Sequence, residues 1–497
     1  MKHCPRALLA LALLALPSPA QGATRPDRWL EVRSPHFVVI SNGGEEQARR
    51  VSRQFERVRA LLRRALASGR DDLSDDPRDP VVVLAVDNED SLRELLPQFW
   101  ERRGQRPVAA YWGGPYQHHI VLRVDATDRE RNRRVLHEYV HLLAHANIPD
   151  LPAWLDEGLS EFWGTALMQN DAVEIGRRAA GHLRVLRSRR TWIPLAELLA
   201  MTRVPEARDS GKLSLFYAQS WALTHYVMLG GSSTALELAP SSYVERLRQG
   251  ANPVEAGALA FGNLSQLEPA LKAYVHADRF RTIRLDGARY GDDGIELRVR
   301  PLSPAESLAA RAGFLVDGER PAAALPLLTE ALRQNPKDAS VLEALGRFHF
   351  QHNNPIEAAR WFDRAIESEA ASYLAYFYRA ILASPVPGGC AAEESVGHLQ
   401  RAISLNPRFA PAYVRLADHY AQGASRLEEA LPLLRRATEI EPDHAAYWVD
   451  LGRLLLRLHR LEEAQAAGQQ GLAVVRAASS RRLVEAFLGE FEPGGPR

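Results

Sequence analysis

The sequence predicts an α+β fold for the first part of the chain and an all-α array of repeated helix pairs for the second. Strand-like runs and amphipathic helical patterns alternate before residue 150. Small residues recur about every 34 residues in the second part, as in the interval from Ala331 to Ala365. A chain of 497 residues is also too long for one hydrophobic core, so two or three domains are expected.

The composition of the chain indicates which classes of partner to expect, but it does not indicate an activity. Hydrophobic residues make up 46% of the chain and charged residues 25%, which is ordinary for a soluble globular protein. With 62 basic and 61 acidic side chains the net charge is +1, which indicates neither nucleic acid nor an anionic membrane surface as a partner. We therefore expect no nucleic-acid partner.

The N-terminus has the pattern of a secretory signal peptide over residues 1–20. A short basic region precedes the apolar residues 7–16, and the small residues 18–20 follow a proline. This apolar run is too short for a bilayer, which needs about 20 residues, so we expect export to the periplasm or the medium and no stable membrane span after signal removal. Loss of Cys4 with the signal leaves Cys390 alone, which excludes an internal disulfide.

The expected elements of the first part follow one another along residues 24–300. Residues 45–67 carry apolar side chains with a helical period, and Thr127 and Glu130 fit a capping box at the start of another helix. Runs rich in valine indicate buried strands. We predict strands at 29–41, 80–86 and 119–124, helices at 45–67, 91–99 and 127–147, a mostly helical stretch to about 280, a closing strand at 295–300 and a linker at 301–304.

A metal-binding pattern lies in the helix expected at 127–147. His137 and His141 are four residues apart, so both imidazoles lie on one helical face and can reach one metal ion. Glu138 lies beside the first histidine. Zinc lowers the pKa of a bound water towards about 7, and a glutamate here can take its proton and pass it to a leaving amine.

A catalytic zinc ion needs a third protein ligand and one open position. Asn147 occupies the place of the third histidine in the metzincin pattern, so that pattern fails. A second helix begins near Trp154 after a turn that contains proline. If it returns antiparallel to the first, it brings Glu157 to the metal.

The two segments together, His-Glu-x-x-His at 137–141 and Trp-Leu-x-Glu-Gly at 154–158, resemble the gluzincin zinc peptidases, including the peptidase-MA-like bacterial proteins. The resemblance covers roughly residues 30 to 290. It implies a zincin-type metallopeptidase domain, with a mixed sheet and a helical subdomain, and one Zn²⁺ per chain. Carried over by position, the ligands are His137, His141 and Glu157, and Glu138 is the general base.

Two further residues are candidates for this site. Tyr217 leads a segment that resembles the helix of aminopeptidase-like gluzincins whose tyrosine hydrogen-bonds the tetrahedral oxyanion, although a core aromatic is an equal alternative. Glu161 lies four residues after Glu157 and can accept a hydrogen bond from a zinc histidine, the alternative being a solvated carboxylate. The Gly-x-Met-Glu-Asn segment of the aminopeptidases is absent, so endopeptidase and exopeptidase action both stay open.

The histidine pair His118 and His119 precedes the strand at 119–124. We expect a surface pair here, with substrate contact as the alternative. The strand itself is a candidate edge to which an extended peptide substrate could add.

The second part, residues 305–477, repeats small, aromatic and proline positions. Ala331 and Ala365 close successive helix pairs 34 residues apart, and Ala402 and Ala437 repeat this at 35. This pattern resembles the tetratricopeptide repeat, in about four to five units. Residues 478–497 are expected to be a C-terminal tail.

These patterns support two functions of different classes. The first is a zinc metallopeptidase that cleaves a peptide or protein substrate, with repeats that recruit the substrate or a protein partner. The alternative is a catalytically inactive zincin fold joined to repeats that act as an interaction scaffold. A purely structural zinc site is less favoured, because such sites are usually closed by four cysteine or histidine ligands.

Overall fold

The computed structural model describes residues 28–66, 80–97, 100, 109–114, 116–125, 128–147, 151–168, 172–205, 209–230, 241–286, 295–318, 320–368, 372–382, 391–422, 426–442, 444–475 and 478–491. The expected signal peptide, both cysteines and the capping box at Thr127 lie outside these residues. Within this part of the chain, no helix combines the length and the apolar character that a bilayer crossing requires.

A six-stranded mixed sheet forms the centre of the N-terminal part. Its strand order is β4-β5-β3-β2-β1-β9. The three central strands β2, β3 and β5 are parallel, while β1, β4 and β9 each pair antiparallel with a neighbour. The strands are β1 (Leu30–Arg33), β2 (Phe37–Ser41), β3 (Val81–Val86), β4 (Ala109–Gly113), β5 (His118–Arg123) and β9 (Arg298–Pro301).

This sheet differs from the sequence prediction in three places. The strand expected at 29–41 is two antiparallel strands, β1 and β2, joined by a turn in which Ser34 donates its backbone N–H to Phe37. Strand β4 was not expected. It occupies the edge of the sheet beside β5, so the strand at 119–124 is paired on both sides and offers no edge to a peptide.

Helices cover both faces of the sheet because side chains of successive strand residues point to opposite faces. On one face, Phe37 packs against Phe55 of α1 (Glu45–Leu66) and Tyr139 of α3 (Asp128–Asn147), with ring centroids 5.1 and 5.6 Å apart. On the other face, Val38 and its neighbours pack against α2 (Glu89–Leu95) and α11 (Pro304–Asp317). The first helix of the repeat array therefore completes the core of the sheet.

A helical subdomain follows α3. It contains α4 (Ala153–Gly164), α5 (Ala180–Ser188), α6 (Leu195–Ala200), α7 (Ser210–Leu229), α8 (Ser241–Arg248), α9 (Pro253–Phe261) and α10 (Leu264–Ala277). A small sheet of β6 (Leu167–Met168), β7 (Ala172–Ile175) and β8 (Ile283–Asp286) accompanies these helices, which the mostly helical prediction did not include. Helix α7 is buried on nearly all sides, and α4 packs along it.

The remaining helices pair in sequence order, α11 with α12, α13 with α14, and so on to α19 with α20. Their close packing depends on small residues, since a Cβ added at Gly346 would lie 2.6 Å from the Phe362 ring. The further bounds are α12 (Pro321–Gln334), α13 (Ala339–Gln351), α14 (Pro355–Glu367), α15 (Tyr373–Ile381), α16 (Ala392–Leu405), α17 (Ala410–Ala421), α18 (Leu427–Ile440), α19 (Ala445–Arg457), α20 (Leu461–Val474) and α21 (Ala478–Gly489).

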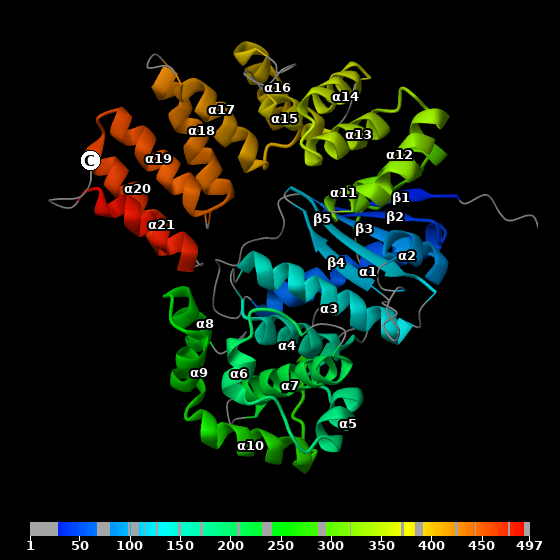
Figure 1. Cartoon of the computed structure of the whole chain (residues 1–497), viewed down its shortest axis with the longest axis vertical. Helices are drawn as coiled ribbons and strands as arrows, with labels where there is room; N and C mark the ends of the chain where they lie inside the picture. Colours follow the sequence, from blue (N-terminus) through cyan, green and yellow to red (C-terminus); the bar gives the residue numbers. More distant parts are fainter. Residues whose placement is uncertain are drawn as a thin grey trace, which may run out of the picture.

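The ends of this array differ from the expected linker and tail. Only two residues separate β9 from α11, and Ser303 and Glu306 form a capping box there, so the connection is ordered. Helix α21 occupies most of the region expected as a tail, and its Phe487 packs against Gly452 of α19. The array arches from the sheet at α11 to the helical subdomain, where α21 contacts α8 (Figure 1).

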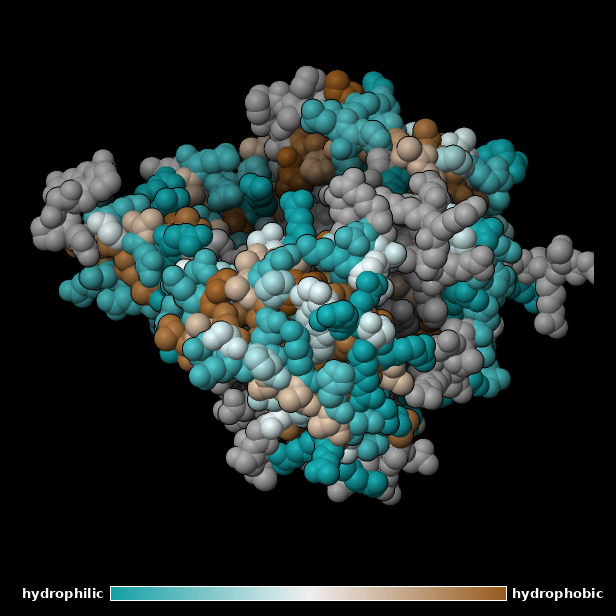
Figure 2. All heavy atoms as spheres, turned by 60° about the horizontal axis from the view of Figure 1, so that its bottom comes forward, coloured by the Kyte–Doolittle hydropathy of each residue, from teal (hydrophilic) through white to brown (hydrophobic). Residues whose placement is uncertain are grey.

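Large exposed hydrophobic side chains are distributed over five helices of the part that the structure describes. They are Leu259 on α9, Leu325 on α12, Ile356 on α14, Leu461 on α20, Val474 on α20 and Leu483 on α21. On the face shown in Figure 2, apolar residues are scattered among hydrophilic ones. Isolated apolar residues are normal on protein surfaces, so they do not by themselves define a docking face.

Candidate metal centre

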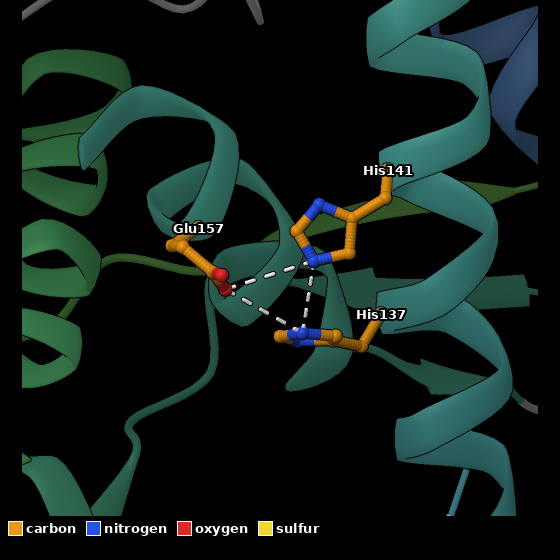
Figure 3. Close-up of side chains that lie close together, drawn as sticks. All are labelled: His137, His141 and Glu157. Carbon is orange, nitrogen blue, oxygen red and sulfur yellow. Dashed lines mark hydrogen bonds and ion pairs between the residues drawn. The ribbon is translucent and has the colours of Figure 1, made fainter. Parts of the chain in front are cut away.

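Helices α3 and α4 pack against each other and bring three candidate ligands together. His137 and His141 project from one face of α3, and Glu157 projects towards them from the first turns of α4 (Figure 3). The Nε2 atoms of the two histidines are 3.1 Å apart. Oε2 of Glu157 lies 3.7 Å from Nε2 of His137 and 3.6 Å from Nε2 of His141.

These separations fit a tetrahedral zinc site. Zinc bonds to histidine and carboxylate of about 2.0–2.1 Å, arranged tetrahedrally, place the ligand atoms about 3.3 Å from one another. The three separations in the structure, 3.1 to 3.7 Å, lie around this value. The three side chains would fill three of the four tetrahedral positions. Oε2 of Glu157 is buried and has no hydrogen-bond partner, which is costly for a carboxylate oxygen unless a cation is present.

Glu161 lies beside His137, on the side of the ring away from Glu157. Its Oε1 lies 3.6 Å from Nδ1 of His137, while its Oε2 accepts hydrogen bonds from Arg133 at 2.7 Å and pairs with His182 at 2.9 Å. Burial raises the pKa of Glu161, but these partners outweigh it and hold that pKa well below its usual value. Glu161 is therefore a charged carboxylate beside the His137 ring, at ion-pair distance, and the hydrogen bond expected from its spacing stays a prediction.

Asp156 contacts the His141 ring on the side away from Glu157, a contact that the sequence pattern did not predict. Its Oδ1 lies 2.8 Å from Nδ1 of His141. Its neighbour Glu157 contacts the other nitrogen of the same ring. Sequence spacing gave no signal for this pair, because adjacent helical residues point about 100° apart and do not usually meet one target.

The electrostatics of the cluster favour a cation. Burial, the neighbouring Asp156 and the other carboxylates raise the pKa of Glu157 to about 8, with His141 opposing this. Burial lowers the pKa of His141, but the hydrogen bond and charge of Asp156, with Glu157 and Glu138, raise it to about 10. A positive charge would be stabilised in this buried group of carboxylates and imidazoles, and a divalent cation is one group that carries such a charge.

The two residues with predicted chemical roles also lie at this centre. Glu138 is 7% exposed and follows His137 directly on α3. Tyr217, on α7, donates its hydroxyl to Oε1 of Glu157 at 3.4 Å. Burial and the charges of Glu157 and Glu161 raise the pKa of Tyr217, so the phenol keeps its proton and remains a donor. Tyr217 thus lies against the core and also contacts a candidate ligand, so the oxyanion role and the packing role both stay predictions.

Gly158 explains why α4 and α7 approach closely enough for this contact. A Cβ at this position would overlap Oγ1 of Thr224 and lie 2.7 Å from the carbonyl oxygen of Ser220, both on α7. The glycine after Glu157 therefore lets α4 pack directly on α7, the helix that carries Tyr217.

The histidine pair at 118–119 is not a surface pair. His119 is 3% exposed, and its Nε2 lies 2.6 Å from Oδ2 of Asp317 on α11. Nδ1 of His118 lies 2.8 Å from the hydroxyl of Tyr111 across the β4–β5 hairpin. Both rings therefore contact other side chains of the protein, and His119 links strand β5 to helix α11 of the repeats.

Comparisons with known proteins bear on the repeat part. Two family models described as tetratricopeptide repeat match residues 315–375 and 421–481. No curated protein matches the chain. The C-terminal helix pairs are therefore tetratricopeptide repeats, which stack into curved surfaces that bind proteins.

Solved repeat structures align with part of the chain. "YrrB: a TPR protein with an unusual peptide-binding site" aligns at 19% identity, over 36% of this chain and 90% of its own, with a TM-score of 0.31. MamA from Desulfovibrio magneticus RS-1 aligns at 18% identity, over 35% and 96%, with a TM-score of 0.30. A thermophilic repeat protein from Thermus thermophilus aligns at 24% identity, over 37% and 98%, with a TM-score of 0.28.

Proposed function

We propose that the chain is an exported zinc-dependent peptidase whose repeats bind its protein substrate or a protein partner. The observation that carries the proposal is the convergence of His137, His141 and Glu157, with Glu138 beside them. A gluzincin-type zincin fold is part of this proposal. It is supported by the sequence resemblance, the mixed sheet and the direction of α4, whose start contacts the end of α3 and whose end contacts its start. Export is supported by the signal pattern of residues 1–20.

The chain's own residues supply most of the chemistry for peptide hydrolysis. His137, His141 and Glu157 would hold a zinc ion, which would supply Lewis acidity and make water a stronger acid near neutral pH. A carboxylate oxygen of Glu138 accepts a proton from the attacking water and returns it to the leaving amine. The hydroxyl of Tyr217 donates a hydrogen bond to the carbonyl oxygen as negative charge develops on it. Asp156 and Glu161 keep the two imidazole rings oriented.

Zinc content tests the ligand set. We expect about one zinc ion per purified chain, as implied by a three-ligand site, and loss of that zinc in His137→Ala and Glu157→Ala. His276→Ala, which removes an exposed histidine on α10, is the matched control and should keep its zinc. A folded chain that takes up no zinc after supplementation overturns the metal site.

Hydrolysis tests the activity separately. Glu138→Gln keeps the shape of the side chain but cannot accept the proton, so cleavage of a library of fluorogenic peptides should be lost while zinc is retained. Undiminished cleavage in Glu138→Gln contradicts the mechanism.

An interaction scaffold is the second candidate. The family matches favour it, since they identify only the repeat part, whereas the peptidase proposal depends on the geometry of the site. A wild-type chain that binds zinc but cleaves no peptide in the library, and that captures a protein through residues 305–477, would support the scaffold.

A further inference from the structure

Tyr116, in the turn between β4 and β5, inserts into the repeat array. Its ring centroid lies 5.1 Å from Phe377, 5.7 Å from Tyr378 and 5.8 Å from Phe409. All three pairs are close to edge-to-face, with interplanar angles of 75–79°, an arrangement that aromatic quadrupoles favour. Phe377 and Tyr378 belong to α15, and Phe409 precedes α17. We call these three residues the aromatic pocket.

Other contacts hold the same hairpin against the first repeats. The guanidinium of Arg320 lies 4.7 Å from the centroid of the Trp112 ring. Asp317 on α11 pairs with His119, and a Cβ on Gly114 would lie 3.4 Å from the Cβ of Asp317. The hairpin thus packs against the repeats from α11 to the start of α17.

The hairpin also reaches the metal centre. Tyr111 lies on β4, five residues before Tyr116, and its hydroxyl bonds to His118 on the opposite strand. Strand β4 also packs against α3, the helix that carries His137 and His141. One short strand therefore runs from the aromatic pocket to the helix that carries two of the candidate zinc ligands.

The pocket's chemistry indicates which side chain it takes. Tyr116 fills it as an aromatic ring, in edge-to-face contact with all three rings of the pocket. Such contacts favour an aromatic side chain over an aliphatic one, and the occupant that the structure shows is a tyrosine. Arrays of this repeat bind extended protein segments along such surfaces.

We propose that the aromatic pocket is a binding site for a tyrosine-bearing peptide segment, and that Tyr116 of the chain's own hairpin occupies it until such a segment competes. An intramolecular ligand acts at a high effective concentration, so a competing peptide meets a reduced apparent affinity. When the competitor binds, the hairpin loses the contacts of Tyr116, and β4 loosens beside the candidate metal centre. This inference rests on the contacts of the hairpin and does not require zinc or peptidase activity.

The chain's own hairpin sequence provides the probe. A fluorescent synthetic peptide with the sequence of residues 109–120 is titrated with the full-length wild-type chain and with Tyr116→Ala, and binding is followed by anisotropy. We expect Tyr116→Ala to bind the peptide about tenfold or more tightly than the wild type, because the internal competitor is gone. Tyr413→Ala, which removes another repeat tyrosine outside the pocket, should behave as the wild type.

Two controls identify the pocket. The same peptide with alanine in place of its tyrosine at position 116 should bind neither chain. Phe409→Leu, added to Tyr116→Ala, removes one ring but stays apolar and should weaken binding several-fold. Equal affinity of the wild type and Tyr116→Ala, or binding by neither, overturns the proposal.

Hydrogen exchange tests the link to β4. Backbone amides of residues 109–113 should exchange faster in Tyr116→Ala, and faster in the wild type with saturating peptide, than in the wild type alone. If exchange in β4 is unchanged both in Tyr116→Ala and in the peptide-saturated wild type, the coupling between the aromatic pocket and β4 is overturned. This conclusion does not depend on the peptide affinities.

Discussion

Oδ1 of Asp156 lies 2.8 Å from Nδ1 of His141, on the side of the ring opposite to the nitrogen that faces Glu157. A carboxylate in this position accepts a hydrogen bond from Nδ1–H, which fixes the tautomer and leaves the Nε2 lone pair directed at the metal position. Two consecutive residues of α4 therefore act on one imidazole, Asp156 from outside and Glu157 from the metal side.

Asp156→Asn should weaken zinc binding by about 10- to 100-fold, because an amide orients the ring less firmly and does not raise its basicity. Competition with a chromophoric chelator at neutral pH measures this. Asp90→Asn, which removes an exposed carboxylate on α2, is the matched control and should not change the affinity. An unchanged affinity in Asp156→Asn would show that the contact does not support the metal.

Gly158→Ala should destabilise the chain by about 1–3 kcal/mol, the usual cost of overpacking, because the added methyl group meets Thr224 and the backbone of Ser220. The free energy of unfolding in urea measures this cost. Gly181→Ala is the control, since a Cβ there meets nothing within 4 Å at an exposed helical position. It should leave stability unchanged or raise it slightly. Equal effects of the two substitutions would contradict the packing argument.

Local sequence patterns predicted the residues whose relations lie within one helix. The four-residue spacing of His137 and His141 fixes their common face, and the same spacing places Glu161 near Glu157. The prediction that Glu157 joins this group required one further assumption, that α4 runs antiparallel to α3. Asp156 was missed because its contact depends on the tilt between the two helices, and helical periodicity carries no information about that tilt.

The edge of the sheet was missed for a different reason. Strand β4 has the sequence Ala-Ala-Tyr-Trp-Gly, which lacks the β-branched run that marked β2 and β3. Its pairing with β5 and the docking of Tyr116 into the repeats are tertiary contacts. The position of α11 is also set by tertiary contacts. Its helical pattern was expected, but its packing on the sheet was not.

The buried group of Asp317, Arg347 and His119 predicts a pH dependence of stability. Burial raises the pKa of Asp317, but Arg347 and His119 outweigh it and lower that pKa from 3.8 to about 2. A carboxylate whose pKa is lower in the folded state contributes stability above its unfolded pKa, and this contribution is lost as the pH falls. The contribution should therefore be complete above about pH 4 and disappear towards about pH 2.

Asp317→Asn isolates this contribution. The variant should be less stable than the wild type by about 3–5 kcal/mol near neutral pH, because the buried Arg347 loses its carboxylate partner. Between about pH 6 and pH 2, the difference between the two chains should shrink by about 2 kcal/mol. Urea unfolding at several pH values measures both. A difference that stays constant with pH would contradict the assigned pKa.

Tyr217→Phe separates the two roles considered for this residue. Phenylalanine keeps the ring and its packing but removes the hydroxyl that lies 3.4 Å from Glu157. If the hydroxyl stabilises the developing oxyanion, peptide cleavage should fall by about 10²- to 10³-fold in kcat, with zinc content unchanged. Tyr226→Phe, on the same helix, is the control and should retain full activity. A Tyr217→Phe chain with wild-type kcat would leave the ring as a packing element only, because the one group that the substitution deletes would then contribute nothing to the transition state.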